Sequence, residues 1–153
     1  MDKFKSTPRL SYKVVSVILT QTDTTVGFLS QNEKQLQTIK SRNNTKPFIK
    51  VYKDFKSLKT RVPTTHKNLV RRSKKTTFII KNRAFRVSQS MLNSSLLNEA
   101  WYFSTSANES GKNFDRIFCE EKADIIVEDK TLLHEKKASS LLKINKKTIR
   151  KLR

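Results

Sequence analysis

The stretch Trp101-Tyr-Phe-Ser-Thr-Ser-Ala-Asn-Glu-Ser-Gly111 tells more about the fold than any other part of this chain. Three aromatic residues lead into seven small or polar residues, and the stretch ends at one of only two glycines in the sequence. Glycine adopts positive φ without steric cost. We therefore predict a buried strand that enters a tight turn. The backbone N–H, hydroxyl and amide groups of such a turn could all donate hydrogen bonds to one anion.

The length and composition predict one folded domain over 1–153, with 1–10 as a frayed basic terminus. The single cysteine, Cys119, excludes an internal disulfide and a multi-cysteine metal site. The longest apolar stretch, 14–19, is far shorter than the ~20 residues that a membrane span requires, and no signal-peptide pattern accompanies it. We expect a cytoplasmic protein without a membrane partner.

The charge of the chain is strongly positive. Lysine and arginine number 33 against 13 aspartates and glutamates, which gives a net charge of +20. A field of this size favours phosphate-bearing partners, either nucleotides or RNA. A solubilising surface or a lysine-rich composition would explain the charge equally well.

Hydrophobic periodicity predicts an α/β protein with a mixed sheet. Alternating or apolar runs predict strands over 13–19, 26–29, 47–52, 76–80, 84–87, 102–103, 124–127, 141–144 and 149–152. Amphipathic patterns predict helices over 32–40, 55–62, 66–72, 89–100 and 113–122, with Asn32 as an N-cap.

Three cations lie where the helix over 32–40 should end. Asn43, Asn44 and Pro47 favour an exit from helix there. At such an end, Lys40 and Arg42 could turn toward one anionic group, and Lys46 could join them. The alternative is that these cations only offset the helix dipole.

Two further places could carry chemistry. Thr22 and Asp23 follow the first predicted strand, which is where open α/β sheets usually place ligands, although an ordinary Ser/Thr turn also fits. Arg86 interrupts an apolar strand, so it faces away from Phe85 and Val87 toward either solvent or a pocket.

At this point the motifs resemble a known family. Ser104-Thr-Ser-Ala-Asn-Glu-Ser-Gly111 resembles the S-T-S-A-N-x-S-G signature of YrdC-like proteins, the bacterial threonylcarbamoyl-AMP synthases. Weaker matches follow the family's order along about 13–150. They are Thr22-Asp23 with Gly27, Lys40-x-Arg42 with Lys46-Pro47, Thr77-Phe78 with Ala84-Phe-Arg-Val87, and Ala123-Asp-Ile-Ile-Val127.

The resemblance implies a twisted α/β sheet around a positively charged cavity. It further implies synthesis of threonylcarbamoyl-AMP from L-threonine, bicarbonate and ATP, with Mg²⁺ on the triphosphate and release of pyrophosphate. The product would serve the threonylcarbamoyladenosine modification at position 37 of tRNA, through downstream transferase proteins. Such chemistry relies on cations and positioning more than on a covalent nucleophile.

The resemblance also implies roles for single residues, none of which is a metal ligand. Lys40 and Arg42 would be catalytic. Threonine or its carbamate would contact Thr22, Lys46, Arg86, Ser106 and either Ser139 or, our preferred assignment, Ser140. The nucleotide would contact Ser104, Asn108 and Arg150.

The sequence departs from the family pattern in several places. Gln21, Val26 and Asn43 replace motif residues, and the family's Gly-rich stretch before its late serine is missing. Two alternatives therefore stay open. One is a non-catalytic module that binds double-stranded RNA or tRNA, and the other is a related acyl- or carbamoyl-transfer enzyme.

Overall fold

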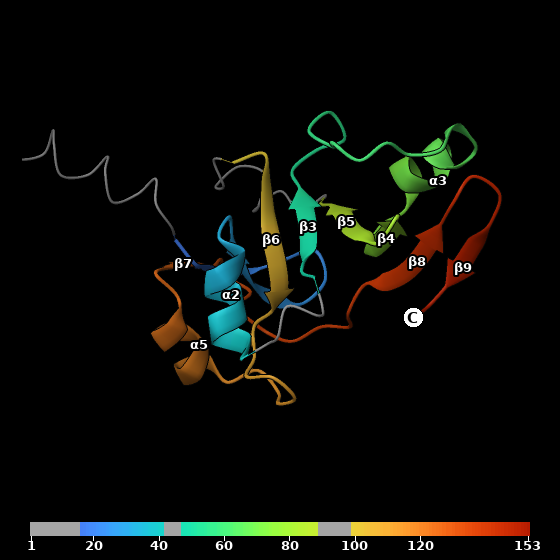
Figure 1. Ribbon diagram of the computed structural model, residues 1–153. Coiled ribbons are helices and arrows are strands. Elements are labelled where there is room, and N and C mark those ends of the chain that lie inside the picture. Colours follow the sequence, from blue (N-terminus) through green and yellow to red (C-terminus); the bar gives the residue numbers. More distant parts are fainter. Residues whose placement is uncertain (1–15, 42–46, 89–98) are drawn as a thin grey trace, which may run out of the picture.

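The computed structural model describes residues 16–41, 47–88 and 99–153, which build a nine-stranded sheet (Figure 1). The strands lie in the order β7-β1-β2-β6-β3-β5-β4-β8-β9. Their bounds are β1 Ile18–Gln21, β2 Val26–Ser30, β3 Ile49–Tyr52, β4 Thr76–Ile80, β5 Arg83–Val87, β6 Trp101–Ser106, β7 Ile125–Val127, β8 Ser140–Ile144 and β9 Ile149–Lys151. Three strand pairs are parallel (β1–β7, β3–β5 and β4–β8) and the other five are antiparallel, which confirms the predicted mixed α/β sheet.

Short helices flank the two halves of this sheet. Near the β7 end lie α2 and α5, whereas α3 lies beside β8 and β9 (Figure 1). The helices are α2 Glu33–Lys40, the 3-10 turn η1 Thr64–His66, α3 Lys67–Arg72 and α5 Arg116–Lys122. None of the described helices is long and apolar enough to cross a membrane.

Two hydrophobic clusters fill the fold. One surrounds Phe28 and Leu36 in the half that contains α2 and α5. The other surrounds Phe78 and Phe85 in the half that contains α3, where the two rings pack with their centroids 5.8 Å apart. Each cluster packs against one part of the sheet.

The helix over 32–40 is confirmed, including both of its ends. The side chain of Asn32 accepts a hydrogen bond from Lys34 N, and Ser41 closes the helix in the left-handed conformation at φ 47°. The helix predicted over 113–122 starts later, at Arg116, because the carboxylate of Asp115 caps it.

Two predictions of secondary structure are wrong in informative ways. No helix forms over 55–62, where a single turn closes between Leu58 N and the carbonyl oxygen of Phe55 at 3.3 Å and does not continue. The strand predicted at 102–103 extends to Ser106, since Ser104 to Ser106 pair with β2. The helix predicted over 89–100 lies mainly outside the described residues.

The close approach of β2 to β6 depends on Gly27. Gly27 pairs with Thr20 of β1 on one side and with Ser106 of β6 on the other. A Cβ at this position would lie 3.0 Å from the carbonyl oxygen of Thr105 and 3.1 Å from Cγ2 of Thr22. The backbone oxygen cannot move without shifting the strand, so a side chain here would separate β2 from β6.

Gly27→Ala should therefore lower the free energy of unfolding by about 1–3 kcal/mol, the usual cost of overpacking. Urea unfolding followed by circular dichroism measures this loss. The matched control is Gly111→Asn, because Gly111 has φ +80° with open space around it and asparagine tolerates this conformation. Equal losses in the two variants would contradict the steric role of Gly27.

Candidate active site

A cavity of about 510 Å³ opens on the sheet face that points away from the α3 cluster. Its walls come from the turn after β1, from β2, β4, β5 and β6, and from the segment that leads into β8. Among the described residues that line it, the two charged ones are Arg86 and Arg153. Hydroxyl groups form much of the remaining polar surface, from Thr22, Ser104, Ser106 and Ser139.

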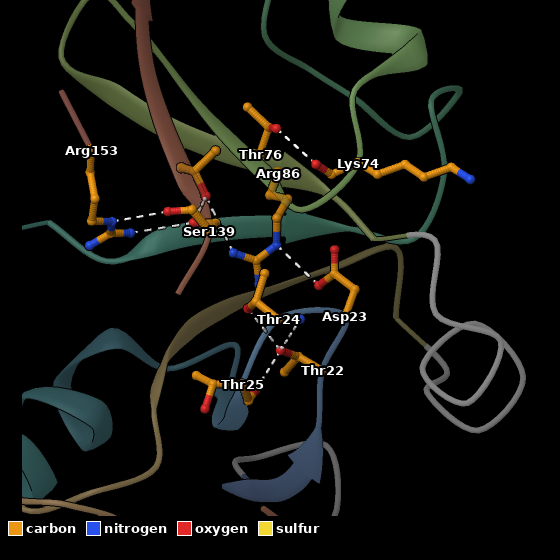
Figure 2. Close-up of polar contacts among 10 residues, drawn as sticks. Thr22, Asp23, Thr24, Thr25, Lys74, Thr76, Arg86, Ser139 and Arg153 are labelled. Carbon is orange, nitrogen blue, oxygen red and sulfur yellow. Dashed lines mark hydrogen bonds and ion pairs between the residues drawn. The ribbon is translucent and has the colours of Figure 1, made fainter. Parts of the chain in front are cut away.

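Arg86 is the buried cation of this cavity, with 4% of its surface exposed. Its Nε donates to Oδ1 of Asp23 at 3.1 Å, and its Nη1 donates to Oγ1 of Thr77 at 3.3 Å (Figure 2). Burial lowers the pKa of Arg86, and the ion pair with Asp23 opposes that shift. The sequence left open whether the Arg86 side chain faces solvent or a pocket, and the structure shows that it faces the pocket.

Ser139 joins a second guanidinium to this group. The hydroxyls of Thr77 and Ser139 lie 2.8 Å apart. Arg153 donates from Nε to the carbonyl oxygen of Ser139 at 2.9 Å and from Nη2 to its hydroxyl at 3.4 Å (Figure 2). Arg86 and Arg153 are thus linked through the hydroxyls of Thr77 and Ser139, and such a pair suits a ligand with more than one negative charge.

Thr22 takes part in the Ser/Thr turn that the sequence left open as an alternative. Its hydroxyl donates to the carbonyl oxygen of Thr25 at 2.6 Å and accepts from Thr24 N at 3.2 Å (Figure 2). The residue nevertheless lines the cavity. The same turn places Asp23 against Arg86. A Ser/Thr turn and a place in the cavity wall are therefore compatible for Thr22.

Lys40 ties the end of α2 to the turn after β6. Its side chain is buried, and Nζ donates to the carbonyl oxygens of Ser106 and Asn108 at 3.0 and 2.9 Å and to Oδ1 of Asn108 at 2.6 Å. In return, the hydroxyl of Ser110 donates to the carbonyl oxygen of Lys40 at 2.6 Å. The lysine therefore organises the signature turn directly.

Asn108 completes this network. Its Oδ1 also accepts from the hydroxyl of Ser106 at 2.7 Å, while Nδ2 donates to the carbonyl oxygens of Glu109 and Lys112 at 3.0 and 2.6 Å. Both ends of the amide are thus engaged within the turn. The predicted contact of Asn108 with a nucleotide would have to exchange one of these hydrogen bonds.

The structure brings together most of the predicted residues that it describes. Thr22, Arg86, Ser104 and Ser106 line the cavity, and Lys40 and Asn108 reach it through Ser106. Ser140 and Arg150 do not line it and are exposed, whereas Ser139 and Arg153 do line it. Arg42 and Lys46 lie outside the described residues.

The correction from Ser140 to Ser139 has a simple cause. Successive residues of an extended segment point to opposite sides, so two adjacent serines cannot be told apart from sequence. Arg153 was missed because the resemblance pointed to Arg150 and no motif surrounds the later arginine. The pairing of Asp23 with Arg86 joins segments 63 residues apart, for which the sequence carried no signal.

No family model matches the sequence, and no curated protein matches it either. Solved structures do match. E. coli YciO is 18% identical and superposes with a TM-score of 0.75 over 92% of this chain and 84% of that chain. P. abyssi Sua5 complexed with L-threonine is 18% identical, with a TM-score of 0.70 over 90% of this chain and 50% of that chain.

Full-length HypF in a phosphate- and nucleotide-bound form is 15% identical, with a TM-score of 0.70 over 90% of this chain and 26% of that chain. The chain spans about half the length of the P. abyssi Sua5 structures that it matches. It therefore has the fold shared by Sua5 and YciO. The resemblance to YrdC-like proteins that the Ser-Thr-Ser-Ala-Asn motif indicated is confirmed at the level of this fold.

Lys40→Met should lower the free energy of unfolding by about 3 kcal/mol, because three acceptors on Ser106 and Asn108 lose a buried ammonium donor. Lys34→Met is the matched control, since Lys34 is exposed on the same helix. Thermal and urea unfolding measure both variants. If Lys40→Met unfolds at the same denaturant concentration as Lys34→Met, then Lys40 does not hold the turn.

Proposed function

We propose that this chain is an L-threonylcarbamoyladenylate synthase, a nucleotidyltransferase that acts on L-threonine, bicarbonate and MgATP. Its product would supply the threonylcarbamoyladenosine modification of tRNA through downstream transferase proteins. The observation that carries the proposal is the Asp23–Arg86 ion pair beside a hydroxyl-lined cavity.

An ion pair at a cavity matches the charges of a free amino acid. The guanidinium of Arg86 can take an α-carboxylate with two parallel hydrogen bonds. The carboxylate of Asp23 can then take the ammonium group of the same molecule. The hydroxyls of Thr22 and Ser106 would meet the side chain of threonine, and L-threonine is the ligand of the P. abyssi Sua5 structure with the same fold.

The reaction requires two bonds to form. The threonine ammonium first releases a proton to solvent, and the neutral nitrogen then adds to the carbon of bicarbonate, from which water leaves to give a carbamate. A carbamate oxygen then attacks the α-phosphorus of ATP, the bond from this phosphorus to the bridging oxygen breaks, and pyrophosphate leaves with the electron pair. Negative charge accumulates at the phosphates, which Arg153 and the proposed cations Lys40, Arg42 and Lys46 would offset.

Lys40 acts in this scheme through the turn that it holds. Its hydrogen bonds to Ser106 and Asn108 hold the turn beside the cavity, which Ser106 lines. Ser104 and Asn108 would face the nucleotide, as the resemblance implies, and Mg²⁺ would accompany the triphosphate, whose oxygens suit it. Fixed donors of this kind need no reorganisation during reaction.

The decisive assay is pyrophosphate release by the purified chain. We expect release that requires ATP, L-threonine and bicarbonate together, and a product with the mass of threonylcarbamoyl-AMP. Omission of any one substrate should reduce release to the background rate. Pyrophosphate release that ignores threonine would reject the proposed substrate.

Arg86→Lys should raise KM for threonine at least tenfold, because an ammonium keeps the charge but loses the planar fork. The matched control is Arg83→Lys, an exposed arginine on the same strand. Steady-state kinetics with threonine as the varied substrate measure both. Equal KM values in the two variants would show that Arg86 does not bind the carboxylate.

Arg153→Gln should lower kcat/KM for ATP by more than tenfold, whereas Arg150→Gln should change it less than threefold. The reason is that Arg153 lines the cavity and contacts Ser139, while Arg150 lies outside the lining. Kinetics with MgATP as the varied substrate separate the two arginines. A larger effect of Arg150→Gln would restore the assignment that the resemblance favoured.

A further inference from the structure

Thr77 carries a hydroxyl group that the fold buries completely. The residue belongs to β4, none of its surface is exposed, and it is not among the residues that line the cavity. Valine has nearly the same shape and has no hydroxyl group to bury. The cost of burying a hydroxyl is offset only by the hydrogen bonds that it makes, so these bonds show what Thr77 does.

Strand pairing decides which side chains Thr77 meets. The antiparallel register of β4 with β5 brings Thr77 next to Arg86. On its other side, Thr77 lies opposite Leu141 of β8. Ser139 precedes Leu141 by two residues, so both point to the same side of an extended segment, and both line the cavity. Thr77 is thereby fixed between a buried guanidinium and a buried serine.

The hydroxyl of Thr77 is shared between these two neighbours. Its oxygen accepts a hydrogen bond from Nη1 of Arg86 at 3.3 Å and lies 2.8 Å from the hydroxyl oxygen of Ser139. The hydroxyl oxygen of Ser139 accepts in turn from Nη2 of Arg153 at 3.4 Å (Figure 2). A cationic donor thus stands at each outer end of a pair of hydroxyl groups.

This arrangement leaves one hydroxyl proton over. The pair has two protons, and the contact between its oxygens uses one of them. Within the part of the chain that the structure describes, no acceptor takes the second proton.

Burial decides which residue holds the unused proton. If Ser139 donated to Thr77, the unused proton would belong to Thr77, outside the cavity lining, where an unmet donor is costly. If Thr77 donates to Ser139, the unused proton belongs to Ser139, which lines the cavity. The second arrangement wastes no donor, because a ligand in the cavity can accept this proton.

Thr77 also restrains the guanidinium of Arg86. Asp23 accepts from Nε at 3.1 Å, whereas Thr77 accepts from Nη1. One hydrogen bond would leave the planar fork free to tilt. Two bonds in different directions fix its plane, and a planar fork recognises a carboxylate only in the matching plane.

We propose that Thr77 is a positioning residue of this cavity: it fixes the plane of the Arg86 guanidinium and turns the hydroxyl proton of Ser139 into the cavity. The identity of the ligand rests on the function proposed above, in which Arg86 binds the α-carboxylate of L-threonine. Arg86 and Ser139 then donate to the same carboxylate, and Thr77 sets their relative direction without contacting the substrate.

The first test is a ¹⁵N NMR spectrum of the arginine side chains in the full chain without substrate. The Arg86 signals are assigned by their loss in Arg86→Lys. Slow rotation about the Nε–Cζ bond gives separate signals for the two Nη nitrogens, and fast rotation merges them. We expect separate signals in the wild type and in Thr77→Ser, and a merged signal in Thr77→Val, which lacks the acceptor that holds Nη1.

The matched control is Thr76→Val. It removes the neighbouring hydroxyl of the same strand, which donates to the carbonyl oxygen of Lys74 at 2.9 Å. The Nη signals of Arg86 should stay separate in this variant. Urea unfolding of all variants confirms that each is folded at the temperature of the measurements.

The second test is the kinetics of pyrophosphate release with L-threonine as the varied substrate. Thr77→Val should raise KM for threonine about tenfold and change kcat less than about threefold, because hydrogen bonds to a charged group contribute on this scale and are lost here in binding. Thr77→Ser keeps the hydroxyl and loses only a methyl group, so it should restore KM to near the wild-type value. Thr76→Val should leave KM near the wild-type value.

Three results would overturn the proposal. They are separate Nη signals in Thr77→Val, equal KM values in Thr77→Val and Thr76→Val, and a failure of Thr77→Ser to restore KM. The spectrum requires no substrate, so it judges the positioning of Arg86 by itself. Absence of pyrophosphate release in the wild type would reject the proposed reaction and leave that judgement unchanged.

Discussion

The ammonium group of Lys40 is the constraint on which the candidate site depends. It joins the last residue of α2 to the turn that follows β6, at Ser106 and Asn108. Each of these acceptors would otherwise need another donor in a partly enclosed space, where an unmet carbonyl is costly. The Lys40 side chain thus joins α2 to the turn after β6. The hydroxyl of Ser110 adds a second link, because it donates to the carbonyl oxygen of Lys40.

The sequence predicted much of this architecture because the signals were local. Asn32 and Ser41 cap the two ends of α2, and alternation identifies β4 and β5. Contacts between distant segments were not visible. Nothing local indicates that Arg86 meets Asp23, or that Arg153 returns to Ser139, because both depend on which strands become neighbours.

The wrong predictions rest on weak local preferences. The helical pattern over 55–62 gives only a single turn between Leu58 N and the carbonyl oxygen of Phe55, and the predicted turn after Phe103 lost three residues to pairing with β2. In the second case a specific hydrogen-bonding partner outweighed a weak statistical preference. The motif resemblance identified the turn after β6 correctly. The side chain of Asn108 bonds to the backbone of this turn, so few residue types fit there.

The Asp23–Arg86 pair has a consequence for selectivity. Without ligand, each charge already satisfies the other, so an incoming bare anion gains only what the guanidinium gives up on releasing its carboxylate. A molecule that brings both signs of charge at the right spacing compensates both partners at once. If the cavity binds threonine as proposed, inorganic phosphate would displace Asp23 from Arg86 without offering a cation in return, whereas a zwitterion would replace both partners.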